Sequence, residues 1–164
     1  MRRDFEQVFT VSFFGHRDFV GTPMDEYHIE RIIEKIVERN PMTDILIGRN
    51  GEFDKCVASV VRRLKKQSYK YEDIRLILVL PYFTAEYANN EGSFHNYYDD
   101  VEICHLSFEA HFKAAIGIRN RYMVDSSDLV VFYINRKSGG AYQTMQYTIQ
   151  LKKKKINLSR IKNV

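Results

Sequence analysis

Cysteine, proline and tryptophan are scarce in this chain, which has two cysteines, three prolines and no tryptophan among its 164 residues. Cys56 and Cys104 show neither the CxxC spacing of a zinc site nor the density of a disulfide-stapled scaffold. We therefore expect both to be reduced thiols in an apolar core. The five histidines also lack metal-ligand spacing. The sequence thus predicts no metal site and no other cofactor.

Long apolar runs are missing as well. The chain begins MRRDFEQ, which does not resemble a signal peptide, and no segment reaches the length of a membrane span. We therefore expect a soluble, cytoplasmic protein with no membrane partner.

A strong excess of one charge is also absent. The chain has 25 basic and 21 acidic residues, so its formal net charge is +4. This mild excess suits an anionic small molecule and argues against nucleic acid as the partner. The run KKKK at 152–155 suits the carboxyl end of a helix, where cations are favourable. A patch that binds nucleic acid is the alternative interpretation of that run.

Apolar residues make up 45% of the chain, including 11 Phe and 11 Tyr, which is enough for one sizeable core. We therefore expect a single domain over residues 1–164. Apolar runs typical of strands occur at 8–14, 44–48, 74–82, 101–106, 129–134 and 156–161. Helical patterns lie between them at 24–40, 53–67, 107–128 and 141–154. The polar and aromatic segment 83–99 has no clear period and is predicted to be a loop with at most one helical turn.

The alternation of strands and helices predicts an α/β fold. We expect a Rossmann-like, doubly wound and mainly parallel sheet, with helices on both faces making three layers. In such sheets, ligands bind beyond the carboxyl ends of the strands. The residues that follow each strand are therefore the first candidates for a binding site.

The first strand, VFTVSFF, runs directly into Gly15, His16 and Arg17. Glycine allows close approach of a ligand to the backbone, and arginine offers a planar fork for phosphate or carboxylate. Histidine can donate or accept a hydrogen bond near neutral pH. These three residues are predicted to bind a ligand.

The second strand leads into GRNGEFD, which contains Gly48, Gly51, Glu52 and Asp54. Two glycines at a strand-to-helix turn leave backbone N–H groups available for an anion. A plain turn, with Glu52 or Asp54 capping the following helix, is the alternative.

The fifth strand leads into NRKSGGAYQT, where Ser138, Gly139 and Gly140 open a helix and Thr144 follows one turn later. This is typical of a phosphate-binding loop. It matches neither the Walker A motif nor the G-x-G-x-x-G fingerprint of dinucleotide-binding proteins.

The helix before the fifth strand carries IRNRYMVDSSD. Arg119 shares a face with Tyr122 and Ser126, whereas Arg121 points elsewhere. Arg119 is a candidate ligand for phosphate, and a solvated basic helical turn is the alternative. The aromatic residues of 82–98 suit either stacking against a base or a lid packed on its own side chains.

Taken in order, FFGHR, GRNGEFD, LILVLPY, RNRYMVDSSDLVVFYI and SGGAYQTMQY resemble the SLOG superfamily over roughly 8–158. That group joins the DNA-processing protein Smf/DprA with the LOG proteins and includes small stand-alone bacterial members. The resemblance implies a Rossmann-like fold that binds nucleotides or nucleotide-derived ligands, as a sensor or a sequestering protein. Together, the strand ends and this resemblance predict the following ligand-binding residues: Gly15, His16, Arg17, Gly48, Gly51, Asp54, Arg119, Asn120, Ser138, Gly139, Gly140 and Thr144.

The chain departs from the LOG enzymes, which hydrolyse the N-glycosidic bond of nucleoside monophosphates. Their catalytic glutamate closes the glycine-rich motif, whereas Gln146 and Tyr147 stand in that region here. Neither side chain can act as a carboxylate base. The resemblance therefore favours a binding protein. The alternative is an N-glycosidase or phosphoribohydrolase-like enzyme, with Glu52 or Asp54 as the catalytic candidate. A homo-oligomer is compatible with the sequence.

Overall fold

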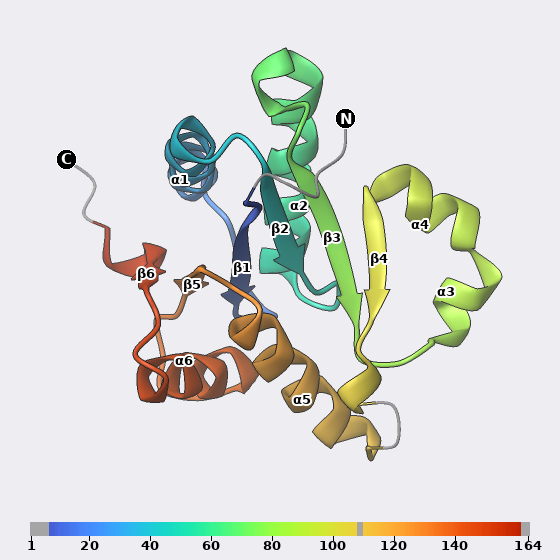
Figure 1. Ribbon diagram of the computed structural model, residues 1–164. Helices are drawn as coiled ribbons and strands as arrows, with labels where there is room; N and C mark the ends of the chain where they lie inside the picture. Colours follow the sequence, from blue (N-terminus) through green and yellow to red (C-terminus); the bar gives the residue numbers. More distant parts are fainter. Residues whose placement is uncertain (1–6, 108–109, 162–164) are drawn as a thin grey trace.

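Six strands form one sheet in which every neighbouring pair is parallel (Figure 1). The computed structural model describes residues 7–107 and 110–161. The strands are β1 (Phe9–Gly15), β2 (Thr43–Ile47), β3 (Arg75–Leu80), β4 (Asp100–Ile103), β5 (Leu129–Tyr133) and β6 (Lys155–Asn157). Their order in the sheet is β4-β3-β2-β1-β5-β6, so the winding direction reverses between β1 and β5.

Helices cover both faces of this sheet. They are α1 (Pro23–Arg39), α2 (Glu52–Gln67), α3 (Ala85–Asn89), α4 (Glu91–Tyr97), α5 (Phe112–Asp125) and α6 (Gly140–Gln150). The core on one face is shared with α1, α2, α3 and α4, and the core on the other with α5 and α6. The predicted three-layer, doubly wound α/β fold is therefore confirmed.

The continuous apolar runs of the strands are explained by burial on both faces. Neighbouring residues of β1 show this, because Phe13 belongs to the core under α1 and α2 while Phe14 belongs to the core under α5 and α6. In β3, Leu78 and Val79 divide in the same way. A strand covered on one face only would have alternated with polar residues.

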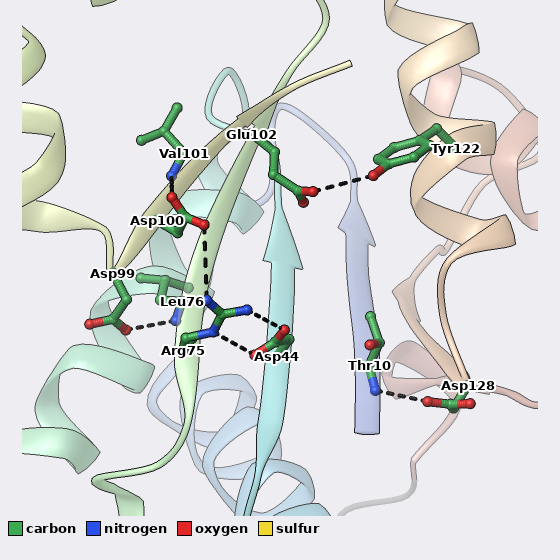
Figure 2. A network of polar contacts seen from close by, with 10 residues as sticks. All are labelled: Thr10, Asp44, Arg75, Leu76, Asp99, Asp100, Val101, Glu102, Tyr122 and Asp128. Atoms are coloured by element: carbon green, nitrogen blue, oxygen red, sulfur yellow. Dashed lines mark hydrogen bonds and ion pairs between the residues drawn. The ribbon is translucent and has the colours of Figure 1, made fainter. Parts of the chain in front are cut away.

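Ion pairs and hydrogen bonds link the strands across the sheet (Figure 2). Arg75 on β3 donates two hydrogen bonds to Asp44 on β2, at 2.9 and 2.7 Å, and lies 4.0 Å from Asp100 on β4. Near the start of β1, the backbone N–H of Thr10 donates to Asp128 at 2.9 Å. These contacts fix neighbouring strands near their amino ends, far from the edge where the predicted ligand residues gather.

The segment 83–99 is more ordered than the predicted loop, because it contains α3 and α4. Thr84 caps α3 by accepting a hydrogen bond from the backbone N–H of Tyr87 at 3.1 Å. The rings of Tyr87 and Phe94 then pack together, with centroids 5.2 Å apart, and both are buried. Helices of five and seven residues are too short to produce a recognisable helical period.

The predicted helix over 107–128 starts later than expected, since α5 begins at Phe112 after a short 3-10 turn at His105–Ser107. Residues 108–109 of that prediction lie outside the described residues. The first buried side chain of α5 is Ala115, so the core does not hold the preceding residues in a helix.

The last predicted strand, 156–161, is also shorter in the structure. It covers Lys155–Asn157 and then turns into a 3-10 helix at Leu158–Arg160. The side chain of Asn157 exchanges two hydrogen bonds with the backbone of Ile134, each at 3.0 Å. Ser159 donates to the same carbonyl at 2.6 Å. These side-chain bonds take the place of further strand pairing.

In the described part of the chain, no helix combines the length and the apolar character that crossing a membrane requires.

Candidate functional site

A cavity of about 470 Å³ lies at the carboxyl ends of β1, β2 and β5, where the winding of the sheet reverses. Its volume falls within the usual range for a small-molecule site, roughly 300–1,000 Å³. The predicted ligand residues that line it are Gly15, His16, Arg17, Gly48, Gly51, Asp54, Arg119, Asn120, Gly139 and Gly140. Residues more than a hundred positions apart in the sequence are thus brought together at one edge of the sheet.

Three predicted residues do not line this cavity. Ser138 is exposed, and Glu52 is exposed and pairs with Lys55 at 3.0 Å. Thr144 is buried behind the cavity wall, where its hydroxyl donates to the Gly140 carbonyl at 2.8 Å. Asp54 is therefore the catalytic candidate that reaches the cavity, whereas Glu52 does not.

Two glycines of the site are required by their surroundings. At Gly48, a Cβ atom would lie 3.0 Å from Asp54 Oδ2 and 3.1 Å from Arg119 Nη1. A side chain there would push these two charged groups apart. Gly139 has a φ of 93°, which L-residues with side chains rarely adopt, and it starts α6 without a side-chain cap.

Arg119 lies at the centre of a chain of hydrogen bonds behind the cavity. Its Nη1 donates to the carbonyl of Val79 at 2.9 Å, and its Nε donates to Asn120 Oδ1 at 3.0 Å. Asn120 Nδ2 then donates to the Thr144 hydroxyl at 3.2 Å. Arg119 is only 8% exposed, so the alternative of a solvated basic turn is wrong. These hydrogen bonds together connect β3, α5 and α6.

Asp54 is the acidic residue that lines the cavity, and its side chain is partly buried. Burial raises the pKa of Asp54 from its ordinary value of 3.8 to about 6, although the Arg119 guanidinium and the Gly51 N–H oppose that rise. The charge of Asp54 in turn opposes the lowering of the Arg119 pKa by burial. The opposite charges of Asp54 and Arg119 therefore partly offset the free-energy cost of burying each group.

His16 joins the first loop of the site to the last. Its Nε2 accepts a hydrogen bond from the backbone N–H of Asn135 at 3.2 Å, so the neutral ring carries its proton on Nδ1. Burial, followed by the charge of Arg136, lowers the pKa of His16. Arg136 also donates to both carboxylate oxygens of Asp18, at 2.9 and 3.0 Å. These contacts hold the β1–α1 and β5–α6 loops against each other.

Several cavity residues were missed by the sequence analysis: Phe14, Asn50, Phe112, Lys113, Ile116, Arg136 and Ala141. Arg136 had the same signal as Arg17, because it follows a predicted strand by two residues. Phe112 and Lys113 had no such signal, since they were placed inside a longer helix. In the structure they form its first turn, and the Phe112 ring is 58% exposed at the cavity.

The lining of the cavity is predominantly cationic. The positively charged side chains are Arg17, Lys113, Arg119 and Arg136, against the single carboxylate of Asp54. Among the described residues, no three His, Cys, Asp or Glu side chains are grouped closely enough to hold a metal ion. The cationic lining suits a negatively charged ligand.

A more open groove of about 1,170 Å³ lies near the opposite edge of the sheet. Lys35 and Arg39 of α1 contribute to it, together with Lys153. The ammonium of Lys153 is already bonded to the carbonyls of Val124, Asp125 and Ser127, at 2.8, 2.9 and 2.6 Å. That lysine closes the end of α5. Lys154 also lines the groove, but so do the carboxylates of Glu38 and Asp128, and the groove is therefore less suited to an anion than the cavity at the carboxyl ends.

The fold is similar to that of DNA processing protein A from Helicobacter pylori, whose solved structure is described for its mode of binding single-stranded DNA. The two structures match with a TM-score of 0.60 and 16% sequence identity. The match covers 90% of this chain and 63% of the other. This likeness shows the fold that the resemblance to Smf/DprA implied. No protein-family model and no curated protein sequence matches the chain.

Proposed function

We propose that this protein binds a nucleotide or a nucleotide-derived ligand in the cavity at the carboxyl ends of the strands. The observation that carries the proposal is the convergence of three cationic side chains, Arg17, Lys113 and Arg136, on glycine-lined strand ends. Such an arrangement offers both charge and close backbone approach to a phosphate.

An exposed aromatic ring beside the cations makes a nucleotide a better candidate than a simple anion. Phe112 lines the cavity, and its ring packs against Tyr82 with centroids 5.9 Å apart. Aromatic faces of this kind stack on bases. Asn120 and His16 provide polar groups at the same wall, so they are the candidates to orient the sugar or the base.

Arg17 and Arg119, each predicted from the sequence to bind phosphate, have different roles in this proposal. Arg119 is buried and engaged with Val79 and Asn120, so it positions the wall and balances Asp54. Arg17 is exposed at the cavity, and its role in the fold is carried by its backbone carbonyl, which accepts from the Glu52 N–H at 3.0 Å. The Arg17 side chain is therefore the proposed phosphate ligand.

Replacement of Arg17 by alanine should weaken binding of adenosine 5′-monophosphate by about tenfold to a hundredfold, the worth of one charge-assisted hydrogen bond. The free energy of unfolding should change by no more than about 0.5 kcal/mol, because the truncated atoms are exposed. Calorimetric titration and urea unfolding would measure the two quantities. Normal affinity in a markedly less stable variant would show that Arg17 is structural.

One observation favours the enzymatic alternative, cleavage of a nucleotide N-glycosidic bond. Asp54 lies in the cavity with a pKa of about 6, which suits proton transfer near neutral pH. Chromatography of the titrated samples would detect a released base. Release that disappears in Asp54→Asn would support an enzyme, and its absence in the wild-type protein would leave binding as the function.

Single-stranded DNA is a further candidate ligand because the structural neighbour is described as binding it. The same cations and the exposed ring of Phe112 would serve a nucleotide within a strand. The chain matches only 63% of that neighbour, and we propose that it acts as one SLOG-like domain on a small ligand. Gel shifts with short oligonucleotides at physiological salt would separate the two ligands.

A further inference from the structure

A second cavity of about 370 Å³ adjoins the first, and Gly48, Asn50 and Asp54 line both. We propose that the two cavities form one two-part site, for a ligand in which two nucleoside units are joined through phosphate. This inference rests on the proposed function, because the first cavity holds one of the two units. It adds that a single nucleotide fills only part of the site.

The second cavity lies between the β2–α2 loop, the first turns of α2 and the α3–α4 segment. Tyr97 and Tyr98 contribute aromatic surface, while Asn50 and Glu86 contribute hydrogen-bonding groups. Lys55 adds a cation with a 63% exposed side chain. Aromatic surface, polar groups and a cation are the features that a nucleoside and its phosphate require.

This second cavity is held open by contacts within the protein. Arg49 donates to Glu86 at 2.6 Å, and its guanidinium carbon lies 4.3 Å from the centre of the Phe94 ring. These interactions fix the α3–α4 segment against the β2–α2 loop, so the cavity is preformed and needs no movement of the backbone.

The shared wall determines how the two halves of a ligand would be connected. It is formed by the loop of Gly48 and Asn50 and by the first turn of α2, whose N-cap residue Gly51 supplies no side-chain hydrogen bond. A phosphate crossing that wall would have Arg17 on one side, since this residue lines only the first cavity of the two. It would have Lys55, which lines only the second, on the other side. The linkage would thus pass between two cations.

The test compares adenosine 5′-monophosphate with two linked compounds by calorimetry. Adenylyl-(3′→5′)-adenosine carries a phosphodiester, and P1,P2-di(adenosine-5′) diphosphate carries a pyrophosphate, so the pair distinguishes the two linkages. We expect at least one linked compound to bind about tenfold more tightly than the monophosphate, because its second unit binds intramolecularly.

Lys55→Glu should remove most of this advantage, whereas the matched control Lys66→Glu, on an exposed part of α2 that lines neither cavity, should keep it. A nonspecific effect of the added negative charge would weaken binding of the monophosphate at least as much as binding of either linked compound. It would therefore not reduce the ratio of the two affinities. Equal affinities for all three compounds, or an advantage that survives Lys55→Glu, would overturn the two-part site and leave the proposed function standing. Failure of all three to bind would overturn the proposed function itself.

Discussion

Replacement of Arg119 by methionine is expected to cost about 3–5 kcal/mol of unfolding free energy at pH 8, because it removes two buried hydrogen bonds and the nearby cation that offsets the burial of the Asp54 carboxylate. Arg119 Nη1 is a hydrogen-bond donor to the Val79 carbonyl, and Asn120 loses the bond from Nε. Methionine has a similar length but supplies no donor and no charge. Urea unfolding of the variant and the wild-type protein measures the difference.

The contribution of charge can be separated from that of the lost hydrogen bonds by a double variant. Asp54→Asn in the Arg119→Met background removes the uncompensated carboxylate, so we expect it to recover a large part of the lost stability, about 2 kcal/mol. Arg121→Met is the matched control, since Arg121 is exposed two positions along the same helix. It should change stability by about 0.5 kcal/mol or less. A similarly small loss in Arg119→Met would contradict the account of the site.

The second large effect is a dependence of stability on pH that comes from Asp54. Its pKa is about 6 in the folded protein against an ordinary value of 3.8, so the folded state holds the proton more tightly. The stabilisation by the protonated form is complete below about pH 3.8, and it is lost as the pH rises through 6. The difference of roughly two pKa units corresponds to about 3 kcal/mol.

Comparison with Asp54→Asn isolates this effect. The unfolding free energy of the wild-type protein relative to the variant should fall by about 2–2.5 kcal/mol between pH 4 and pH 7. The lowered pKa of His16 acts in the opposite direction, because its neutral form is lost as the pH falls. It is present in both proteins and cancels in the difference. A difference that stays constant with pH would show that folding does not shift the pKa of Asp54, and one that rises with pH would show that the folded state stabilises its carboxylate; either result would contradict this expectation.

The sheet could be predicted from the sequence because its strands are buried on both faces. The run that contains Leu78 and Val79 has no polar alternation, and such runs separated by amphipathic helices favour a parallel sheet. The position of the candidate site followed from the same argument, since Gly15, Gly48 and Gly139 each come after a strand. The structure places all three at one cavity.

The environments of the charged residues could not be predicted in this way. Helical spacing gives the face on which Arg119 lies, but not that the carbonyl of Val79, 40 positions earlier, is its partner. The second cavity was missed for a related reason. It depends on α4, whose seven residues carry too weak a period, and on the pairing of Arg49 with Glu86 across 37 positions. Long-range contacts of this kind leave no local pattern.

Nucleotide binding at the carboxyl ends of the strands can be followed residue by residue in an NMR titration with adenosine 5′-monophosphate. The ¹⁵N-labelled protein reports each backbone amide separately. We expect the amide signals of Gly48, Gly51, Gly139 and Gly140 to shift together with one dissociation constant, while those of Lys35 and Arg39 in the opposite groove stay in place. Shifts confined to the opposite groove, or no shifts at millimolar nucleotide, would contradict nucleotide binding at this site.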